Sequence, residues 1–239
     1  MTLNFADFRL LTFDCYGTLI DWEAGILPVL KKLLNDHQVI LPDQTILEVF
    51  AEAESLAEVG DYVNYRQILQ KVVIYLAEKY HFSPSNAELN CLADSIQYWL
   101  PFADTVKALQ LFKTRYQLAI ISNIDDALLQ GSLTHLQVDF DGIITAQQVQ
   151  SYKPALNNFH QAIARLGVEP SQILHVAQSI YHDIIPAQSV GLKTVWVNRR
   201  QGKTGAGATP VATAQPDLEV PDLQSLVQLI EAQNPQIFL

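Results

Sequence analysis

Residues 12–19, TFDCYGTL, place an aspartate between a buried strand and a tight turn. The apolar run at 10–13 predicts a short buried strand, and Gly17 breaks it. Asp14 therefore lies at the carboxyl end of this strand, where a carboxylate is well placed to act as a nucleophile. A second acid two residues later could donate a proton to a leaving group, but the chain has Tyr16 there. The leaving group is therefore expected to need little help.

Two kinds of segment follow this strand. Apolar residues at three-and-four spacing predict helices over 22–36, 43–58, 62–80 and 86–98. After residue 104 the chain alternates between predicted strands, over 118–122, 141–146, 173–178 and 193–198, and predicted helices, over 125–136, 155–166 and 182–190. Strands rich in Ile, Val and Leu that alternate with helices predict a mostly parallel sheet covered on both faces. The sequence therefore predicts an α/β core that is interrupted, directly after its first strand, by a helical block.

Composition and charge narrow the class of protein. Of the 239 residues 49% are hydrophobic and 17% charged, which is enough apolar material for a packed core. The net charge of −10 disfavours nucleic acids and anionic membranes as partners, because both call for a basic face. Cys15 and Cys91 are too few for a disulfide framework. We expect a cytoplasmic protein with a small-molecule partner, and its oligomeric state stays open.

Segment 201–217 is rich in Gly, Ala, Thr and Pro. Its GAGATP stretch neither follows a predicted strand nor opens a helix, so it is not a phosphate-binding fingerprint. The composition predicts a mobile loop rather than a second site.

Polar side chains follow four of the predicted strands: Asp14 with Thr18, Ser122 with Asn123, Lys153, and Asp183. Ligands of open parallel sheets bind outside the carboxyl ends of the strands, so these side chains are expected to meet. Each residue also has an ordinary structural explanation. Ser122 and Asp183 are common helix N-cap types, and Lys153 could be a solvated lysine. Their joint occurrence at one sheet edge predicts a site with two carboxylates, a hydroxyl and an amine.

In this order the residues resemble the four motifs of the haloacid dehalogenase superfamily. The resemblance spans about residues 8–200, with DCYGTL at 14–19 as its first motif. The tyrosine in that motif is similar to the 2-haloacid dehalogenase (type II) branch, as is WVNR at 196–199. The resemblance implies a Rossmann-like core domain of residues 1–20 and 101–239, and an inserted α-helical cap domain of residues 21–100.

The resemblance also implies a mechanism. Asp14 would attack carbon in a small organic acid, displace halide and form an ester that water cleaves. Halide leaves without a proton, so no acid is needed two residues after Asp14, and this accounts for Tyr16. Lys153 would hold Asp14 ionised, and Asp183 would pair with Lys153 and orient the water. The residues implied to bind substrate are Tyr16, Thr18, Ser122 and Asn123. Dehalogenation of this kind requires no cofactor.

Two segments depart from the dehalogenase pattern. Gln178 and Ile180 stand where the dehalogenases carry a serine and an asparagine. Segment 50–58 has three acids and no arginine, whereas the dehalogenases place an arginine early in the cap for the substrate carboxylate. A bare carboxylate would be repelled there unless Arg66 or Lys71 reaches the site, and both are expected to be solvated.

Two alternative functions remain open at this point. The first is a Mg²⁺-dependent small-molecule phosphatase that lacks the usual general acid. Asp14, the backbone carbonyl of Tyr16 and Asp183 would then supply oxygen ligands to the metal. The second is a non-catalytic binding module on the same fold.

Two histidines accompany the last motif. His182 adjoins Asp183 and could act as a base or bind substrate, but a partly exposed position in the first turn of a helix is the more common case. His175 lies inside a predicted buried strand and is expected to be a hydrogen-bonded core histidine.

Overall fold

The computed structural model describes residues 3–233 and contains a six-stranded sheet with helices on both faces. The strands are β1 (Leu10–Phe13), β2 (Gln117–Ser122), β3 (Gly142–Thr145), β4 (Ile173–Ala177), β5 (Lys193–Val197) and β6 (Leu218–Val220). Their order is β3-β2-β1-β4-β5-β6, and every neighbouring pair is parallel. The predicted α/β fold class is therefore confirmed, with β1 at the centre of the sheet.

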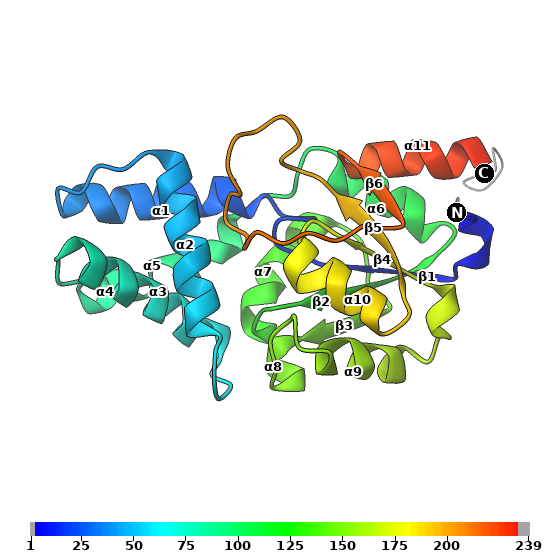
Figure 1. Cartoon of the computed structure of the whole chain (residues 1–239), viewed down its shortest axis with the longest axis horizontal. Helices are drawn as coiled ribbons and strands as arrows, with labels where there is room; N and C mark the ends of the chain where they lie inside the picture. Colours follow the sequence, from blue (N-terminus) through cyan, green and yellow to red (C-terminus); the bar gives the residue numbers. More distant parts are fainter. Residues whose placement is uncertain (1–2, 234–239) are drawn as a thin grey trace.

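The helices form two groups (Figure 1). The first group follows β1 and lies to one side of the sheet: α1 (Trp22–Asp36), α2 (Asp43–Ala57), α3 (Tyr65–Tyr80), α4 (Asn86–Leu89), α5 (Cys91–Ser95) and the short η2 (Ile96–Tyr98). The second group belongs to the sheet: α6 (Thr105–Lys113), α7 (Asp126–Leu136), α8 (Ala146–Val149), α9 (Asn157–Leu166), η4 (Ile180–Ile184), α10 (Ile185–Ser189) and α11 (Leu223–Gln233). The domain boundaries at residues 20 and 101 stay a prediction.

Alternating side chains of the strands supply two apolar layers. In β2, Leu118 and Ile120 join the layer that contains Phe112 of α6. Ala119 and Ile121 point to the other face and join a second layer with Phe159 of α9. Both faces of the strands are thus buried, as expected for a parallel sheet. Among residues 3–233, no helix is long and apolar enough to cross a bilayer.

Two short stretches, 19–21 and 100–102, connect the helical insertion to the sheet, and we call them the double linker. They run side by side, with an antiparallel bridge between Ile20 and Pro101. The N–H of Asp21 donates to the carbonyl of Leu100 at 2.9 Å, and the N–H of Phe102 donates to that of Leu19 at 3.1 Å. The insertion therefore leaves and re-enters the core at one place, directly behind the end of β1.

The prediction of one continuous helix over 86–98 is wrong. The segment instead forms α4, α5 and η2. Asn90 stands at the break between α4 and α5, where its side-chain amide donates to the carbonyl of Asn86 and its side-chain oxygen accepts from Arg66 and Gln70. Asparagine side chains that bond to nearby backbone in this way compete with regular helix.

Candidate active site

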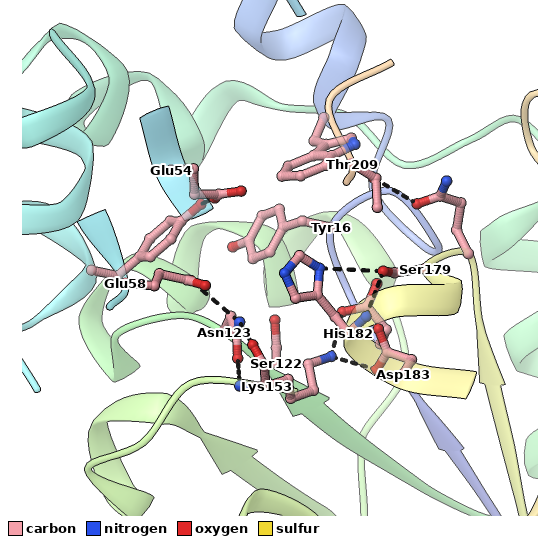
Figure 2. Close-up of a pocket in the computed structure, with 14 residues that line it drawn as sticks. Tyr16, Glu54, Glu58, Ser122, Asn123, Lys153, Ser179, His182, Asp183 and Thr209 are labelled. Atoms are coloured by element: carbon pink, nitrogen blue, oxygen red, sulfur yellow. Dashed lines mark hydrogen bonds and ion pairs between the residues drawn. The ribbon is translucent and has the colours of Figure 1, made fainter. Parts of the chain in front are cut away.

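The carboxyl ends of β1, β2 and β4 and one end of α2 surround a small cavity (Figure 2). Six of the seven predicted site residues line it: Asp14, Tyr16, Ser122, Asn123, Lys153 and Asp183. The seventh, Thr18, lies behind Asp14. The cavity measures about 40 Å³, which is more than a single water molecule requires.

Lys153 joins the two carboxylates at the bottom of the cavity. Its Nζ donates to Asp14 Oδ1 at 2.9 Å, to Asp183 Oδ1 at 2.6 Å and to the carbonyl of Ile121 at 2.9 Å. The side chain of Asn123 brackets the lysine backbone, because it accepts from the lysine N–H and donates to the lysine carbonyl. With three acceptors for three N–H groups, the ammonium has a fixed place.

The two carboxylates differ in electrostatic environment. Burial raises the pKa of Asp14 above its usual value, against the lowering by Lys153. Burial also acts on Asp183, but the Lys153 charge and a hydrogen bond from His175 bring its pKa below the usual value. Asp183 is thus the better stabilised anion. The negative charge of Asp14 is less well compensated, which suits a carboxylate that reacts as a nucleophile.

Thr18 holds the second oxygen of Asp14. Its hydroxyl donates to Asp14 Oδ2 at 2.7 Å and accepts the N–H of Gln178 at 2.9 Å. Thr18 is fully buried and is not among the residues that line the cavity. It therefore orients the carboxylate and ties the end of β1 to the end of β4; its predicted contact with substrate stays a prediction.

Tyr16 lines the cavity, but its hydroxyl is engaged elsewhere. The phenol oxygen lies 2.9 Å from Ser132 Oγ on α7, and the ring meets that of Trp99 edge to face. Burial raises the pKa of Tyr16 well above its usual value. A buried phenol that is bonded to Ser132 is a poor proton donor for a leaving group beside Asp14.

Two buried oxygen atoms of the cavity residues have no hydrogen-bond partner among residues 3–233: Ser122 Oγ and Asp183 Oδ2. Buried polar atoms are almost always paired, so an unpaired one calls for an occupant. Figure 2 shows the Ser122 side chain rising toward the space beside His182. Both oxygens are therefore candidate contacts for a ligand or for water.

The sequence reasoning did not place Glu54 and Glu58 in the site. Both line the cavity, four residues apart at the end of α2. Glu54 accepts from the Tyr65 hydroxyl, and burial raises its pKa to about 7. Glu58 accepts from Asn123 Nδ2 at 3.3 Å, and burial raises its pKa well above the usual value. One sequence signal was available: Glu54 follows Phe50 by four residues and so falls on the apolar face of the helix.

Arg66 and Lys71, the two cations that could have reached the site, do not reach it. Arg66 pairs with Asp94 at 2.7 Å, and neither Arg66 nor Lys71 lines the cavity. The acidic character that the sequence assigned to segment 50–58 is therefore retained in the folded protein.

The two histidines have different outcomes. His182 is only 9% exposed and lines the cavity, so its expected partly exposed position is wrong. It is held inward because its backbone N–H donates to Ser179 Oγ, which also lies 3.2 Å from its Nδ1. Burial lowers the pKa of His182 to about 4, so the imidazole is neutral at pH 7. His175 is fully buried and bonded to Thr12 and Asp183, as expected.

Thr209 was also missed, because segment 201–217 was expected to be a mobile loop. Thr209 lines the cavity, and its hydroxyl donates to Gln178 Oε1 at 3.1 Å. The neighbouring N–H of Ala208 donates to Glu23 Oε1 at 3.1 Å. These contacts hold the middle of the segment against α1 and the end of β4.

Replacing Glu54 by Gln is expected to stabilise the protein at pH 8 by about 1–3 kcal/mol and to change little at pH 4.5. The folded pKa of Glu54 is raised from 4.5 to about 7. As pH rises through this window the unfolded chain ionises and the folded protein does not, so wild-type stability falls. The full difference corresponds to about 3 kcal/mol. Urea unfolding at both pH values measures the change.

The control for this experiment is Glu52→Gln. Glu52 lies on the same helix but is exposed and pairs with Lys79. This variant should differ little from wild type at either pH. A stability change in Glu54→Gln that is the same at pH 4.5 and pH 8 would contradict the assigned ionisation.

Comparison with known proteins relates this geometry to one family. The model of the haloacid dehalogenase-like hydrolases matches residues 8–191. The (S)-2-haloacid dehalogenase of Pseudomonas sp. (strain YL) is 28% identical over 92% of this chain and 94% of its own length. The (S)-2-haloacid dehalogenase 4A of Burkholderia cepacia is 25% identical over 80% of this chain and 84% of its own length.

A solved structure has the same fold. The L-2-haloacid dehalogenase from Xanthobacter autotrophicus, with chloropropionic acid covalently bound, superposes with a TM-score of 0.78. The match covers 94% of this chain and 98% of that one, at 18% sequence identity. At this identity the likeness concerns the fold alone.

Proposed function

The chain belongs to the haloacid dehalogenase-like hydrolases, and from this premise we propose that it removes halide from a small organic acid through an ester at Asp14. The observation that carries the proposal is the setting of Asp14. Its carboxylate lies at the cavity between Thr18 and Lys153, and the acid that an alkoxide leaving group needs is missing, since Tyr16 is bonded to Ser132. The relatives named as (S)-2-haloacid dehalogenases support the same class of substrate.

The reaction proceeds in two steps. An Asp14 oxygen forms a bond to the carbon that bears the halogen, and the electron pair of the carbon–halogen bond leaves with halide. Water then adds to the carbonyl carbon of the ester, which releases the hydroxy acid, a proton and the free carboxylate. Asp183 Oδ2, buried and without a protein partner among residues 3–233, is a suitable acceptor for that water. Lys153 offsets the charge of Asp14 before attack and after hydrolysis.

A Mg²⁺-dependent phosphatase is the second candidate, and the unpaired Asp183 Oδ2 favours it. Among residues 3–233, no group of three His, Cys, Asp or Glu side chains is placed to hold a metal ion, so the Tyr16 carbonyl would have to join Asp14 and Asp183. These donors are all oxygens, which fits the preference of Mg²⁺. The ion would supply stabilisation of charge on a phosphoryl group.

We also propose a small-molecule substrate, a cytoplasmic location and no nucleic-acid partner. A small-molecule substrate fits a cavity of about 40 Å³. A cytoplasmic location fits the two free thiols, Cys15 and Cys91. The net charge of −10 makes nucleic acid an unsuitable partner.

Activity assays with halogenated short acids and phosphate esters, each with Mg²⁺ and with a chelator, separate the candidates. We expect halide release that a chelator does not change. Turnover in ¹⁸O-labelled water should also place ¹⁸O in the Asp14 peptide, because water attacks the aspartyl ester and not the substrate carbon. Phosphate release that chelation abolishes would select the second candidate. If neither halide nor phosphate is released from any compound of a broad panel, a binding module is favoured.

A further inference from the structure

The wall of the cavity contributed by the helical insertion is acidic and aromatic. Glu54 and Glu58 both lie, in the view of Figure 2, on the opposite side of the cavity from Asp183. The indole of Trp22 and the phenol of Tyr65 belong to the same wall. Carboxylates combined with aromatic rings form a favourable environment for a cation.

Carboxyl groups outnumber lysine and arginine side chains in the described lining of the cavity. Four carboxyl groups line it, from Asp14, Glu54, Glu58 and Asp183. Lys153 is the one lysine or arginine among the described lining residues, and its ammonium is already shared by Asp14 and Asp183. A substrate whose only charge is a carboxylate would therefore find no free cation in the cavity. A substrate with a positive charge would instead pair with the two glutamates, which burial otherwise makes hard to ionise.

The surroundings of Glu54 and Glu58 provide hydrogen bonds but little positive charge. Glu54 is faced by the Tyr65 hydroxyl and by the charge of Asp14. Glu58 is faced by the Asn123 amide and by Glu54, with a weaker opposing effect from Lys153. The raised pKa values of both glutamates have burial as their main cause, which means that hydrogen bonds and, for Glu58, the charge of Lys153 do not fully compensate their ionised forms.

An independent feature indicates that a ligand enters this cavity. The Ser122 side chain is 2% exposed, its Oγ has no hydrogen-bond partner among residues 3–233, and it lines the same cavity. It belongs to β2 and not to the helical insertion that carries the two glutamates. A ligand that satisfies Ser122 while filling the cavity also reaches the acidic wall.

We propose that the substrate carries an ammonium group that Glu54 and Glu58 bind, which makes it a small amino acid with a leaving group rather than a bare short-chain acid. This inference rests on the proposed function at Asp14 for the reaction itself. With the two glutamates, this wall of the cavity selects a positively charged group.

Binding tests the inference without any turnover. L-alanine and propionate differ by one ammonium group, and calorimetry on the intact protein gives the affinity for each. We expect L-alanine to bind about 10- to 100-fold more tightly, the range of a charge-assisted hydrogen bond. The Glu54→Gln/Glu58→Gln variant should lose this preference. Glu52→Gln, on the exposed side of α2, should keep it, and thermal unfolding establishes that each variant is folded.

A kinetic pair completes the test. 3-Chloroalanine and 3-chloropropionate differ by the same ammonium group, and the first should have the higher kcat/KM by a similar factor. Equal or tighter binding of propionate, or a preference that survives the double substitution, would overturn the inference even if halide is released. A preference for L-alanine together with no halide release from any halogenated acid tested would leave the binding inference standing and would overturn the dehalogenase proposal.

Discussion

Replacing Asp14 by Asn is expected to abolish turnover and to leave the protein folded. The amide cannot form the ester, so we expect the rate to fall by about 10⁴-fold or more. Stability should be kept or slightly increased. The substitution removes one of two buried carboxylates that share a single ammonium, and burial already raises the pKa of Asp14. Steady-state halide release and thermal unfolding on the same preparation measure both effects.

Asp21→Asn is a matched control for this experiment. Asp21 lies seven residues further along and caps α1 by accepting from the N–H of Ala24. Asparagine is an equally good N-cap, so both rate and stability should stay near wild type. A folded Asp14→Asn protein that retains turnover, with mass spectrometry excluding deamidation back to aspartate, would refute the nucleophile.

Replacing Lys153 by Met is expected to cost about 3–5 kcal/mol of stability at pH 8 and to lower turnover at least about 100-fold. Lys153 is 1% exposed and its ammonium lies between Asp14 and Asp183, so its loss leaves two buried carboxylates without their shared cation. Without Lys153 their folded-state pKa values would lie above the unfolded values. The loss of stability should therefore grow as pH rises through the carboxylate range and shrink as pH falls toward 4.

Urea unfolding of two further variants checks the cause of this loss. Lys193→Met removes an exposed ion pair with Asp217 and should cost no more than about 1 kcal/mol. Lys153→Met combined with Asp183→Asn should recover part of the lost stability, because one unpaired charge is gone. If the double variant is no more stable than Lys153→Met alone, packing rather than charge explains the effect.

The sequence predicts most of the helices and strands because the periodic pattern of apolar residues stops where helix- or strand-breaking residues occur. Predicted helix 22–36 matches α1, where Asp21 supplies the cap. Predicted helix 62–80 starts late, at Tyr65, because Asn64 and Gln67 form a capping box there. Strand β6 has only three residues, Leu218–Val220, which is too short to show an alternating pattern. The final helix α11 carries an apolar repeat in its sequence that the prediction overlooked.

Site residues at the ends of strands can be predicted from the sequence. Site residues that reach the cavity only because a helix or loop packs over the sheet edge cannot. Asp14 directly follows β1 and Ser122 ends the neighbouring strand β2, so the sheet alone brings them together. Glu54 and Glu58 reach the cavity only because α2 lies over that edge of the sheet. The place of Glu54 on the apolar face of α2 indicates burial but not the surface that it faces. Thr209 depends on the contact of its loop with Gln178, which the Gly-rich composition conceals.

The double linker has a consequence for the order of folding. Leu10 pairs with Gln117, so β1 is made more than a hundred residues before its first partner strand. If the helices of the insertion form first, the bridge between Ile20 and Pro101 brings distant parts of the chain together. The loop left to close is then shorter by roughly fourfold, and its entropic cost falls by about 1.2 kcal/mol. Early folding of the insertion would thus speed the pairing of the apolar strand β1 once β2 has been synthesised, and so limit the exposure of an unpaired strand that is prone to aggregate.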